Sequence, residues 1–319
     1  MGKLIGMGEL LIDFASIGEG SLAETKQFIK NAGGAPANVA VQVSKLGQKA
    51  MYLTKVGANG FGDFLIDSLK KEGVDTSLIQ KDARYDTSLA FVSFQKNGER
   101  EFSFYRKKAA DLHFKANDFA TVNFEKNDIF EFGSVALASS DGINAHNALI
   151  QKAVDNHAIV AFDPNLRFNL WPNKKRLAKT VLAFIPKANI LKLSEDELFF
   201  LTGISDYHKA VYSLFKGNVK AILLTLGDKG AKLYLANGTI YEHSGYKVKA
   251  IDTTGAGDSC FGGFLGMLLA NNASLDTLYA QNFADYLAFA CKCGAYTTTN
   301  LGAIPAMGTI KEINSFFDC

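Results

Sequence analysis

The stretch IDTTGAGDSC, residues 251–260, places two glycines directly before a lone aspartate. Its first residues are rich in β-branched side chains and favour an extended segment, and Gly255-Ala256-Gly257 permits a tight turn. The apolar and small residues that follow predict a helix packed on all sides. A glycine turn that opens a helix leaves backbone N–H groups unpaired, which forms an anion site favoured by the helix dipole. Asp258 lies in the first turn of this helix, so the stretch predicts a general base beside a phosphate.

The same residues also have a purely structural interpretation. Gly255 and Gly257 can form only a tight turn, and Asp258 can be only a favourable partner of the helix dipole. Short glycine motifs often match by chance in unrelated proteins. The choice between a phosphate site and a plain turn therefore depends on the rest of the chain.

The composition is that of an ordinary globular protein, with 319 residues, 48% hydrophobic and 21% charged, and a net charge of +2. This balance gives no reason to expect a nucleic-acid or membrane surface. No apolar run reaches the roughly 18 residues that a spanning helix needs, and the N-terminus is typical of a strand rather than of a signal peptide. The four cysteines lack the paired spacing of a zinc site, which favours reduced thiols in a cytoplasmic protein.

Short apolar runs alternate with amphipathic segments along the chain. Val39, Val43 and Leu46 recur at helical spacing, which predicts a helix in that region. Several runs, of which 158–165 is one, are nearly continuous in apolar residues, as in strands covered on both faces. Residues 4–13 (LIGMGELLID) are interpreted as the first strand, with Asp13 at its end. Together these patterns predict an α/β fold with a mainly parallel sheet and helices on both faces.

One region breaks this alternation. Residues 87–106 contain two alternating runs around Asn97-Gly98, a pair of residues that favours a two-residue hairpin turn. Residues 14–32 lack a helical pattern and are expected to add strands to the hairpin. Such an insertion between parallel-sheet units can act as a lid.

A second glycine motif, GGAPANVA at residues 33–40, provides close backbone approach, a proline suited to a first helical turn and the amide of Asn38. In isolation this motif is no more than a glycine turn before a helix. Together with DTTGAGDSC it resembles the two signature regions of the ribokinase-like (PfkB) carbohydrate kinases, and the chain is most similar to the fructokinase branch. Further matches occur in the expected order: GELLIDF (8–14), REFSFYRKKAADL (100–112), AFDPNLRFNLWP (161–172), LKLSEDELFFLTG (191–203), LTLGDKGA (224–231) and GAIPA (302–306).

The resemblance implies a single ribokinase-like domain over residues 1–319, with three α/β/α layers and a discontinuous β lid at about 12–32 and 87–107. It implies a cytoplasmic enzyme that transfers the γ-phosphoryl group of ATP to a hydroxyl of D-fructose with Mg²⁺. It also implies a homodimer formed through the lid, because lids of this family can pair with each other.

The resemblance also assigns the catalytic and sugar-binding residues. Asp258 is the base, the turn at Gly255, Ala256 and Gly257 is the anion hole, and Arg167 engages the substrate or the γ-phosphate. The sugar is expected to contact Asp13, Gly33, Gly34, Asn38, Arg106 and Asp258. The alternatives are a strand-end cap for Asp13 and a solvated edge-strand charge for Arg106. Asp163 and Asn165 either order water and metal or only shape their turn.

The nucleotide and ion sites follow from the same resemblance. Nucleotide contacts are expected from Lys192, Thr225, Gly227, Gly230, Gly255 and Gly257, although Thr225 and Gly227 can also belong to a plain hairpin turn. Glu197 is expected to bind Mg²⁺ mostly through water, with Ser194 in place of the asparagine usual in the family. The alternative for Glu197 is ordinary acidity at a helix N-terminus. A K⁺ site is expected at Asp252, Thr254, Asn300 and Gly302.

Two rival functions remain open at this point. A kinase of 2-keto-3-deoxygluconate would suit Arg106 and Arg167, which can pair with a carboxylate, whereas Asp13 would repel one. A catalytically silent sugar-binding or regulatory protein is the alternative from another class. Such a protein is expected to lose the base or its turn, and both are intact here.

Overall fold

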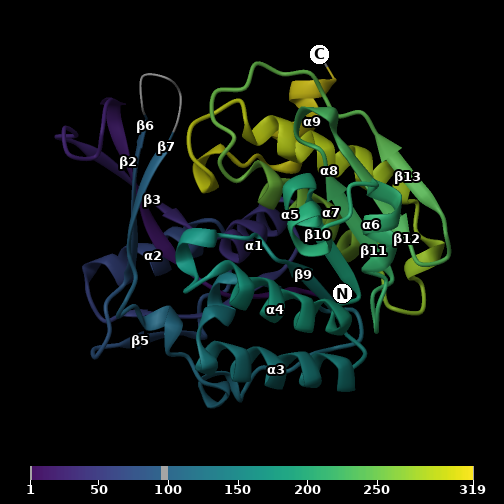
Figure 1. Ribbon diagram of the computed structural model, residues 1–319, viewed down its shortest axis with the longest axis horizontal. Coiled ribbons are helices and arrows are strands. Elements are labelled where there is room, and N and C mark those ends of the chain that lie inside the picture. Colours follow the sequence, from purple (N-terminus) through teal and green to yellow (C-terminus); the bar gives the residue numbers. More distant parts are fainter. Residues whose placement is uncertain (1, 95–99, 319) are drawn as a thin grey trace.

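A large, mainly parallel sheet forms the centre of the protein in the computed structural model, which describes residues 2–94 and 100–318 (Figure 1). Within these residues the sheet has nine strands in the order β13-β12-β11-β10-β9-β8-β1-β4-β5. β12 and β13 are antiparallel to their neighbours, and the other strand pairs are parallel. The strands are β1 (Leu4–Met7), β4 (Ala50–Gly57), β5 (Ile79–Asp82), β8 (Ile129–Gly133), β9 (Ile159–Asp163), β10 (Ile190–Ser194), β11 (Ala221–Thr225), β12 (Ala231–Leu235) and β13 (Ile240–His243).

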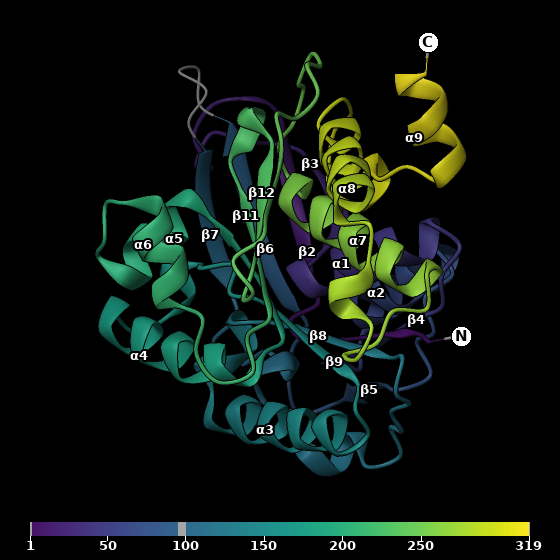
Figure 2. The same cartoon turned by 90° about the vertical axis from the view of Figure 1, so that its right-hand side faces the viewer.

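Helices cover both faces of this sheet, as the alternating pattern predicts (Figure 2). One face packs against α1 (Ala35–Lys45), α2 (Gly60–Lys71), α7 (Ala256–Ala270) and α8 (Phe283–Thr297). The other packs against α3 (Ser140–Asp155), α4 (Lys174–Phe184), α5 (Glu195–Thr202) and α6 (Tyr207–Ser213), and α9 (Ile310–Phe317) adds a small cluster beside α8. Successive side chains of a strand enter opposite cores: Leu4 contributes to one and Ile5 to the other. This burial on both faces explains why the strands are nearly continuous in apolar residues.

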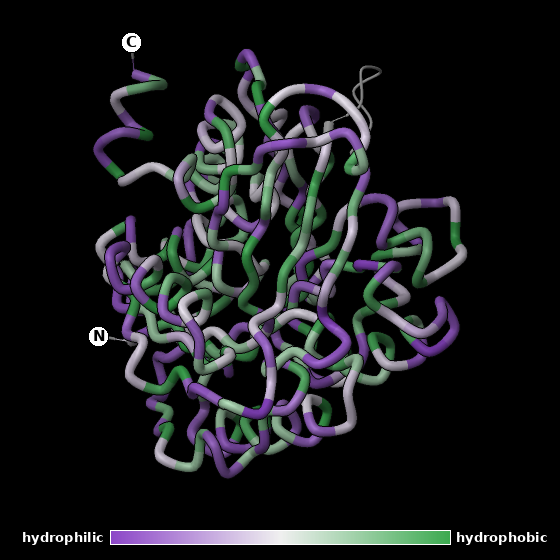
Figure 3. The backbone as a smooth tube through the Cα atoms, turned by 90° about the vertical axis from the view of Figure 1, so that its left-hand side faces the viewer, coloured by the Kyte–Doolittle hydropathy of each residue, from purple (hydrophilic) through white to green (hydrophobic). Residues whose placement is uncertain are grey.

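A smaller, four-stranded sheet lies beside this body, in the order β3-β2-β6-β7. It contains β2 (Leu11–Glu19), β3 (Phe28–Gly33), β6 (Ser88–Phe94) and β7 (Arg100–Tyr105). Hydrophobic stretches run along these strands when the molecule is viewed from this side (Figure 3). The hairpin expected at 87–106 is confirmed as the antiparallel pair β6–β7. Its expected turn at Asn97-Gly98 lies outside the described residues.

The interpretation of residues 4–13 as one strand is wrong. β1 ends at Met7, and β2 begins at Leu11 in the smaller sheet, so the chain crosses between sheets at residues 8–10. The crossing is held by the Tyr52 hydroxyl, which donates to the Glu9 carbonyl at 2.6 Å, and by the Thr54 hydroxyl, which donates to the Gly8 carbonyl at 2.7 Å. Asp13 is therefore a residue of β2 rather than the end of a main-sheet strand.

None of the helices in the described part of the chain has the length and apolar content required to cross a bilayer.

Candidate active site

The two glycine motifs meet at the N-termini of α1 and α7. The side-chain amide of Asn38, in α1, donates to Oδ2 of Asp258, in α7, at 2.8 Å, although the residues are 220 positions apart. Asp258 is 8% exposed, so its carboxylate lies in a largely enclosed position. The contact places the predicted base directly beside the predicted sugar-binding amide.

A buried polar chain holds the two helices together just behind this contact. The Ser259 hydroxyl donates to Oε1 of Gln42 at 2.8 Å, and the Thr297 hydroxyl donates to Ser259 at the same distance. Gly262 permits this close approach, because a Cβ there would lie 2.7 Å from Cβ of Gln42. These contacts were not predicted from the sequence: Gln42 and Thr297 lie outside the two glycine motifs, and Ser259, although within DTTGAGDSC, was given no role. The chain fixes the distance between α1 and α7 and therefore between Asn38 and Asp258.

The glycine turn before α7 has the strained backbone that its sequence suggests. Gly255 has φ +77°, and a Cβ at this position would lie 2.7 Å from Cβ of Ala303. The N–H groups of Gly255 and Gly257 have no hydrogen-bond partner among the described residues. The Ala256 N–H instead donates to the Thr253 carbonyl at 3.3 Å. Two of the three expected anion-hole donors are thus unengaged, and the third is partly engaged within the turn.

A buried cation lies against this turn. Nζ of Lys192, in β10, donates to Oδ2 of Asp163, in β9, at 2.8 Å. A Cβ added to Gly257 would lie 3.2 Å from the same Nζ. Burial alone would lower the pKa of Lys192, but the carboxylates of Asp163, Glu197 and Asp258 outweigh it and raise the pKa. Lys192 therefore carries a positive charge beside the anion hole, which suits contact with a phosphate.

The other oxygen of Asp163 shapes its own turn, because Oδ1 accepts from the backbone N–H of Asn165 at 3.1 Å. Asn165 has φ +41°, which asparagine tolerates better than most residues. Asp163 thus both closes its turn and pairs with Lys192, and its expected part in ordering water and metal stays a prediction.

Asp13 brings the smaller sheet to the site. Gly33 in β3 lies so close to Asp13 that a Cβ there would collide with Oδ2. Gly34 has φ +129°, and a Cβ there would collide with the Glu9 carbonyl. Burial raises the pKa of Asp13 to about 6, with the positive charge of Arg167 opposing the rise and the charge of Asp258 adding to it. The charges of Arg167 and Asp258 therefore both influence the ionisation of Asp13.

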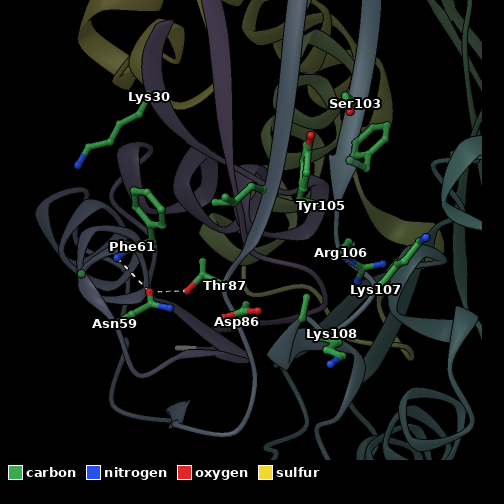
Figure 4. Close-up of a pocket in the computed structure, with 14 residues that line it drawn as sticks. Lys30, Asn59, Phe61, Asp86, Thr87, Ser103, Tyr105, Arg106, Lys107 and Lys108 are labelled. Carbon is green, nitrogen blue, oxygen red and sulfur yellow. Dashed lines mark hydrogen bonds between the residues drawn. The ribbon is translucent and has the colours of Figure 1, made fainter.

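The two arginines singled out in the sequence differ in their surroundings. Arg167 is exposed in the loop after β9. Arg106 follows β7 and is only 6% exposed, so its interpretation as a solvated edge charge is wrong. Its guanidinium donates from Nε and Nη2 to Oδ2 of Asp111 at 3.2 and 3.0 Å. Arg106 also borders a cavity of about 1170 Å³ at the base of β6 and β7, whose lining includes neither Asp13 nor Asp258 (Figure 4).

The expected nucleotide residues lie at the end of β11. Thr225 is the last residue of that strand, and Gly227 has φ +62° with open space around its Cα. The hairpin alternative is confirmed in this segment, because β11 pairs antiparallel with β12 and the Leu226 N–H donates to the Gly230 carbonyl at 2.8 Å. A Cβ at Gly230 would collide with the His243 carbonyl at the end of β13. Packing between strands therefore accounts for this glycine without a ligand.

Glu197 uses both carboxylate oxygens within the protein. Oε1 accepts from the Leu166 N–H at 2.7 Å, and Oε2 accepts from the Ser194 N–H at 2.9 Å. The Ser194 hydroxyl oxygen in turn accepts from the Glu197 N–H at 3.4 Å, so the two residues form a capping box at the start of α5. The described residues contain no cluster of three or more histidine, cysteine, aspartate or glutamate side chains suited to hold a metal. A Glu197 carboxylate whose two oxygens already accept bonds within the protein fits a Mg²⁺ ion that is held mainly by phosphates and water.

The expected K⁺ loop is partly assembled. Oδ1 of Asp252 accepts from the N–H and hydroxyl of Thr254 at 2.9 and 2.7 Å, and Oδ2 accepts from the Gly302 N–H at 2.9 Å. Asn300 is exposed, and its amide donates to the neighbouring Thr299 at 3.3 Å. Three of the four expected residues are thus directly connected.

Two buried carboxyl groups near the site were not predicted from the sequence. Neither oxygen of Glu131, in the central strand β8, has a partner among the described residues, and burial raises its pKa well above the usual range. Burial also raises the pKa of Glu9 to about 7. An acidic residue inside an apolar strand, as in IFEFG at residues 129–133, is the signal that could have drawn attention to Glu131.

Comparison with known proteins finds relatives over nearly the whole chain. Residues 1–310 match the model of the pfkB family carbohydrate kinases. Probable fructokinase-5 of Arabidopsis thaliana is 41% identical over 96% of this chain and 94% of that protein. The fructokinase of Vibrio cholerae O395, solved with fructose, ADP and calcium, has a TM-score of 0.89 at 32% identity over 99% of both chains. The ATP-bound fructokinase of Xylella fastidiosa has a TM-score of 0.89 at 31% identity, over 99% of this chain and 98% of that one. A double mutant of the Vibrio protein, solved with fructose, ADP and potassium, has a TM-score of 0.88 at 31% identity, over 99% and 98% of the two chains.

Proposed function

Because this chain belongs to the PfkB family of carbohydrate kinases, we propose that it is an ATP-dependent fructokinase, which transfers the γ-phosphoryl group of ATP to a hydroxyl of D-fructose. The observation that carries this proposal is the contact between Asn38 and Asp258 at 2.8 Å, directly beside the glycine turn. It joins a carboxylate, a sugar-binding amide and an anion site, which are the groups that phosphoryl transfer to a hydroxyl requires.

Asp258 takes the proton of the attacking hydroxyl. The Asn38 amide holds Oδ2 of Asp258, which leaves Oδ1 to face the acceptor. The unengaged N–H groups of Gly255 and Gly257 receive the oxygens of the transferring group, and Lys192 adds a positive charge from the side of β10. Arg167, in the exposed loop after β9, supplies a second positive charge.

The sugar is oriented from both sheets. Oδ1 of Asn38 is buried and has no partner among the described residues, so it can accept a bond from a sugar hydroxyl. Asp13 can accept from two further hydroxyls, and Gly33 and Gly34 allow the sugar to approach the backbone. As part of the lid, the smaller sheet excludes water when it closes over the acceptor.

The nucleotide and ions complete the site. Lys192 in β10, Thr225 at the end of β11 and Gly227 in the turn that follows border the space for ATP. Glu197 would hold Mg²⁺ through water, and the ion would supply neutralisation of the phosphate charge. K⁺ is expected at Asp252, Thr254 and Gly302, the loop that precedes the anion hole.

The exposed part of the smaller sheet supports a homodimer formed through the lid. Ile17, Ile29 and Phe102 are 54%, 53% and 45% exposed, and strand register places them on the same face as Asp13. Apolar side chains this exposed on one face are suited to burial against a second copy. The buried, free thiols of Cys260, Cys291 and Cys293 agree with a cytoplasmic location.

Coupled ADP release tests the function. Wild type and Asp258→Asn are compared with ATP, Mg²⁺ and fructose, ribose, tagatose or 2-keto-3-deoxygluconate. We expect a fructose-dependent rate that falls by roughly 10²–10⁴-fold in the variant, the usual effect of losing a general base. Absence of fructose turnover by folded wild type would refute the proposal, and turnover of the keto acid alone would assign another substrate.

A further inference from the structure

Arg106 and Asp111 form a buried ion pair at the base of the smaller sheet. The two bonds from Arg106 end on Oδ2 of Asp111, and Oδ1 accepts from the Ser88 hydroxyl at 2.7 Å. Arg106 is 6% exposed and Asp111 is 1% exposed. Such a pair has little net charge, and removing one partner leaves the other charge buried without compensation.

This pair lies on the side of the sheet that faces the acceptor sugar. The register of β2, β6 and β7 places Asp13 and Phe104 on one face, and Arg106 follows Phe104 by two residues along the same alternation. The guanidinium also opposes the rise of the Glu9 pKa that burial causes, and Oε1 of Glu9 accepts from the first N–H of α1, the helix that carries Asn38. Arg106 therefore lies on the sugar-facing side of the smaller sheet, beside Glu9 and the start of the helix that carries Asn38.

We propose that Asp111 is a specificity-determining residue that makes the acceptor site prefer neutral sugars over sugar acids. The inference rests on the proposed function. A sugar acid needs a cation that is not already neutralised, and Asp111 neutralises Arg106 before any substrate arrives. The carboxylates of Asp13 and Asp258 nearby would repel the acid further, whereas a neutral ketose needs only hydrogen bonds.

The test compares kcat/KM for fructose and for 2-keto-3-deoxygluconate in wild type and in Asp111→Asn. Asparagine has the same shape and can still accept bonds from Arg106, so the substitution mainly removes the charge. We expect the ratio of keto acid to fructose to rise about tenfold, the scale of one charge interaction across roughly 12 Å at an effective dielectric constant near 20. The rise should be largest at low salt.

Two further variants show whether the freed guanidinium is the cause. The double variant Arg106→Gln with Asp111→Asn should lose the gain, because no cation is then released. Asp82→Asn is the matched control, since Asp82 in β5 also accepts two bonds from an arginine, Arg84, at 3.0 and 2.8 Å. Its ratio should equal that of wild type.

An unchanged ratio in folded Asp111→Asn, or a gain that persists in the double variant, would overturn the inference. Wild type provides a measurement that does not depend on the folding of any variant: equal kcat/KM for the two substrates would also overturn it. Failure of wild type to phosphorylate fructose would instead refute the proposed function, so the two failures are distinguishable.

Discussion

Asp13→Asn is expected to make the protein more stable while weakening its use of fructose. Asp13 is a carboxylate that the fold holds in a poorly solvated position, with its pKa raised to about 6 by burial. If Asp13 serves sugar binding rather than the stability of the fold, its replacement should raise stability and lower activity with fructose.

The magnitude follows from the difference between the usual pKa of 3.8 and about 6 in the folded state. This difference corresponds to roughly 3 kcal/mol. The folded state binds the proton more tightly than the unfolded state does, so ionisation of Asp13 destabilises the fold. The destabilisation is absent below about pH 4, grows between pH 4 and 6, and is complete above pH 6. Asparagine cannot ionise, so the variant should gain roughly 3 kcal/mol at pH 8 and only about 0.5 kcal/mol at pH 4.

Urea denaturation without sugar or nucleotide, at pH 4 and pH 8, measures this gain. Asp67→Asn, which removes an exposed carboxylate of α2, is the control and should show no gain that depends on pH. In the same variant of Asp13, kcat/KM for fructose should fall by roughly 10- to 100-fold, because hydrogen bonds to a charged group are lost. Equal stability of wild type and variant at pH 8 would refute the reasoning.

Three other changes test the phosphate side of the site. Lys192→Met should reduce the free energy of unfolding by about 3–5 kcal/mol because it leaves Asp163 buried and unpaired. A melting temperature as high as that of the exposed-lysine control Lys175→Met would contradict this. Gly257→Ala places a methyl group 3.2 Å from Nζ of Lys192. We therefore expect kcat to fall about tenfold with little change in the melting curve. An unchanged kcat would refute the anion-hole assignment. Replacing KCl by choline chloride at equal chloride should lower kcat in wild type but not in Asp252→Asn, and equal wild-type rates would argue against a K⁺ site.

Much of the fold could be predicted because local patterns report burial directly. The helical spacing of Val39 and Val43 and the apolar run at 158–165 each correspond to an element of the structure. The hairpin at 87–106 was also predictable, since its alternation reflects one covered face. The break at residues 8–10 was not, because both halves of 4–13 are apolar and nothing in their periodicity shows that they enter different sheets.

The site divides in the same way. The two glycine motifs identified Asp258 and Asn38, because a tight turn that opens a helix leaves a local signature in the sequence. The pairing of Arg106 with Asp111 was hidden, since either residue alone is compatible with a solvated charge. Gly230 shows a different limit: its motif suggested a ligand, whereas the structure adds a packing reason for the glycine at β13, and its contact with the nucleotide stays a prediction.

The sequence by itself therefore determined the α/β class, the family, and the position of the proposed base and the turn beside it, because each depends on residues that are neighbours along the chain. Only the tertiary structure decided that Asn38 reaches Asp258 across 220 positions, that Lys192 lies against Gly257, and that Arg106 is neutralised before a substrate arrives. The physical reason is that these contacts depend on how whole helices and strands pack. Packing depends on the shape and volume of many side chains together, and no local pattern in the sequence records it.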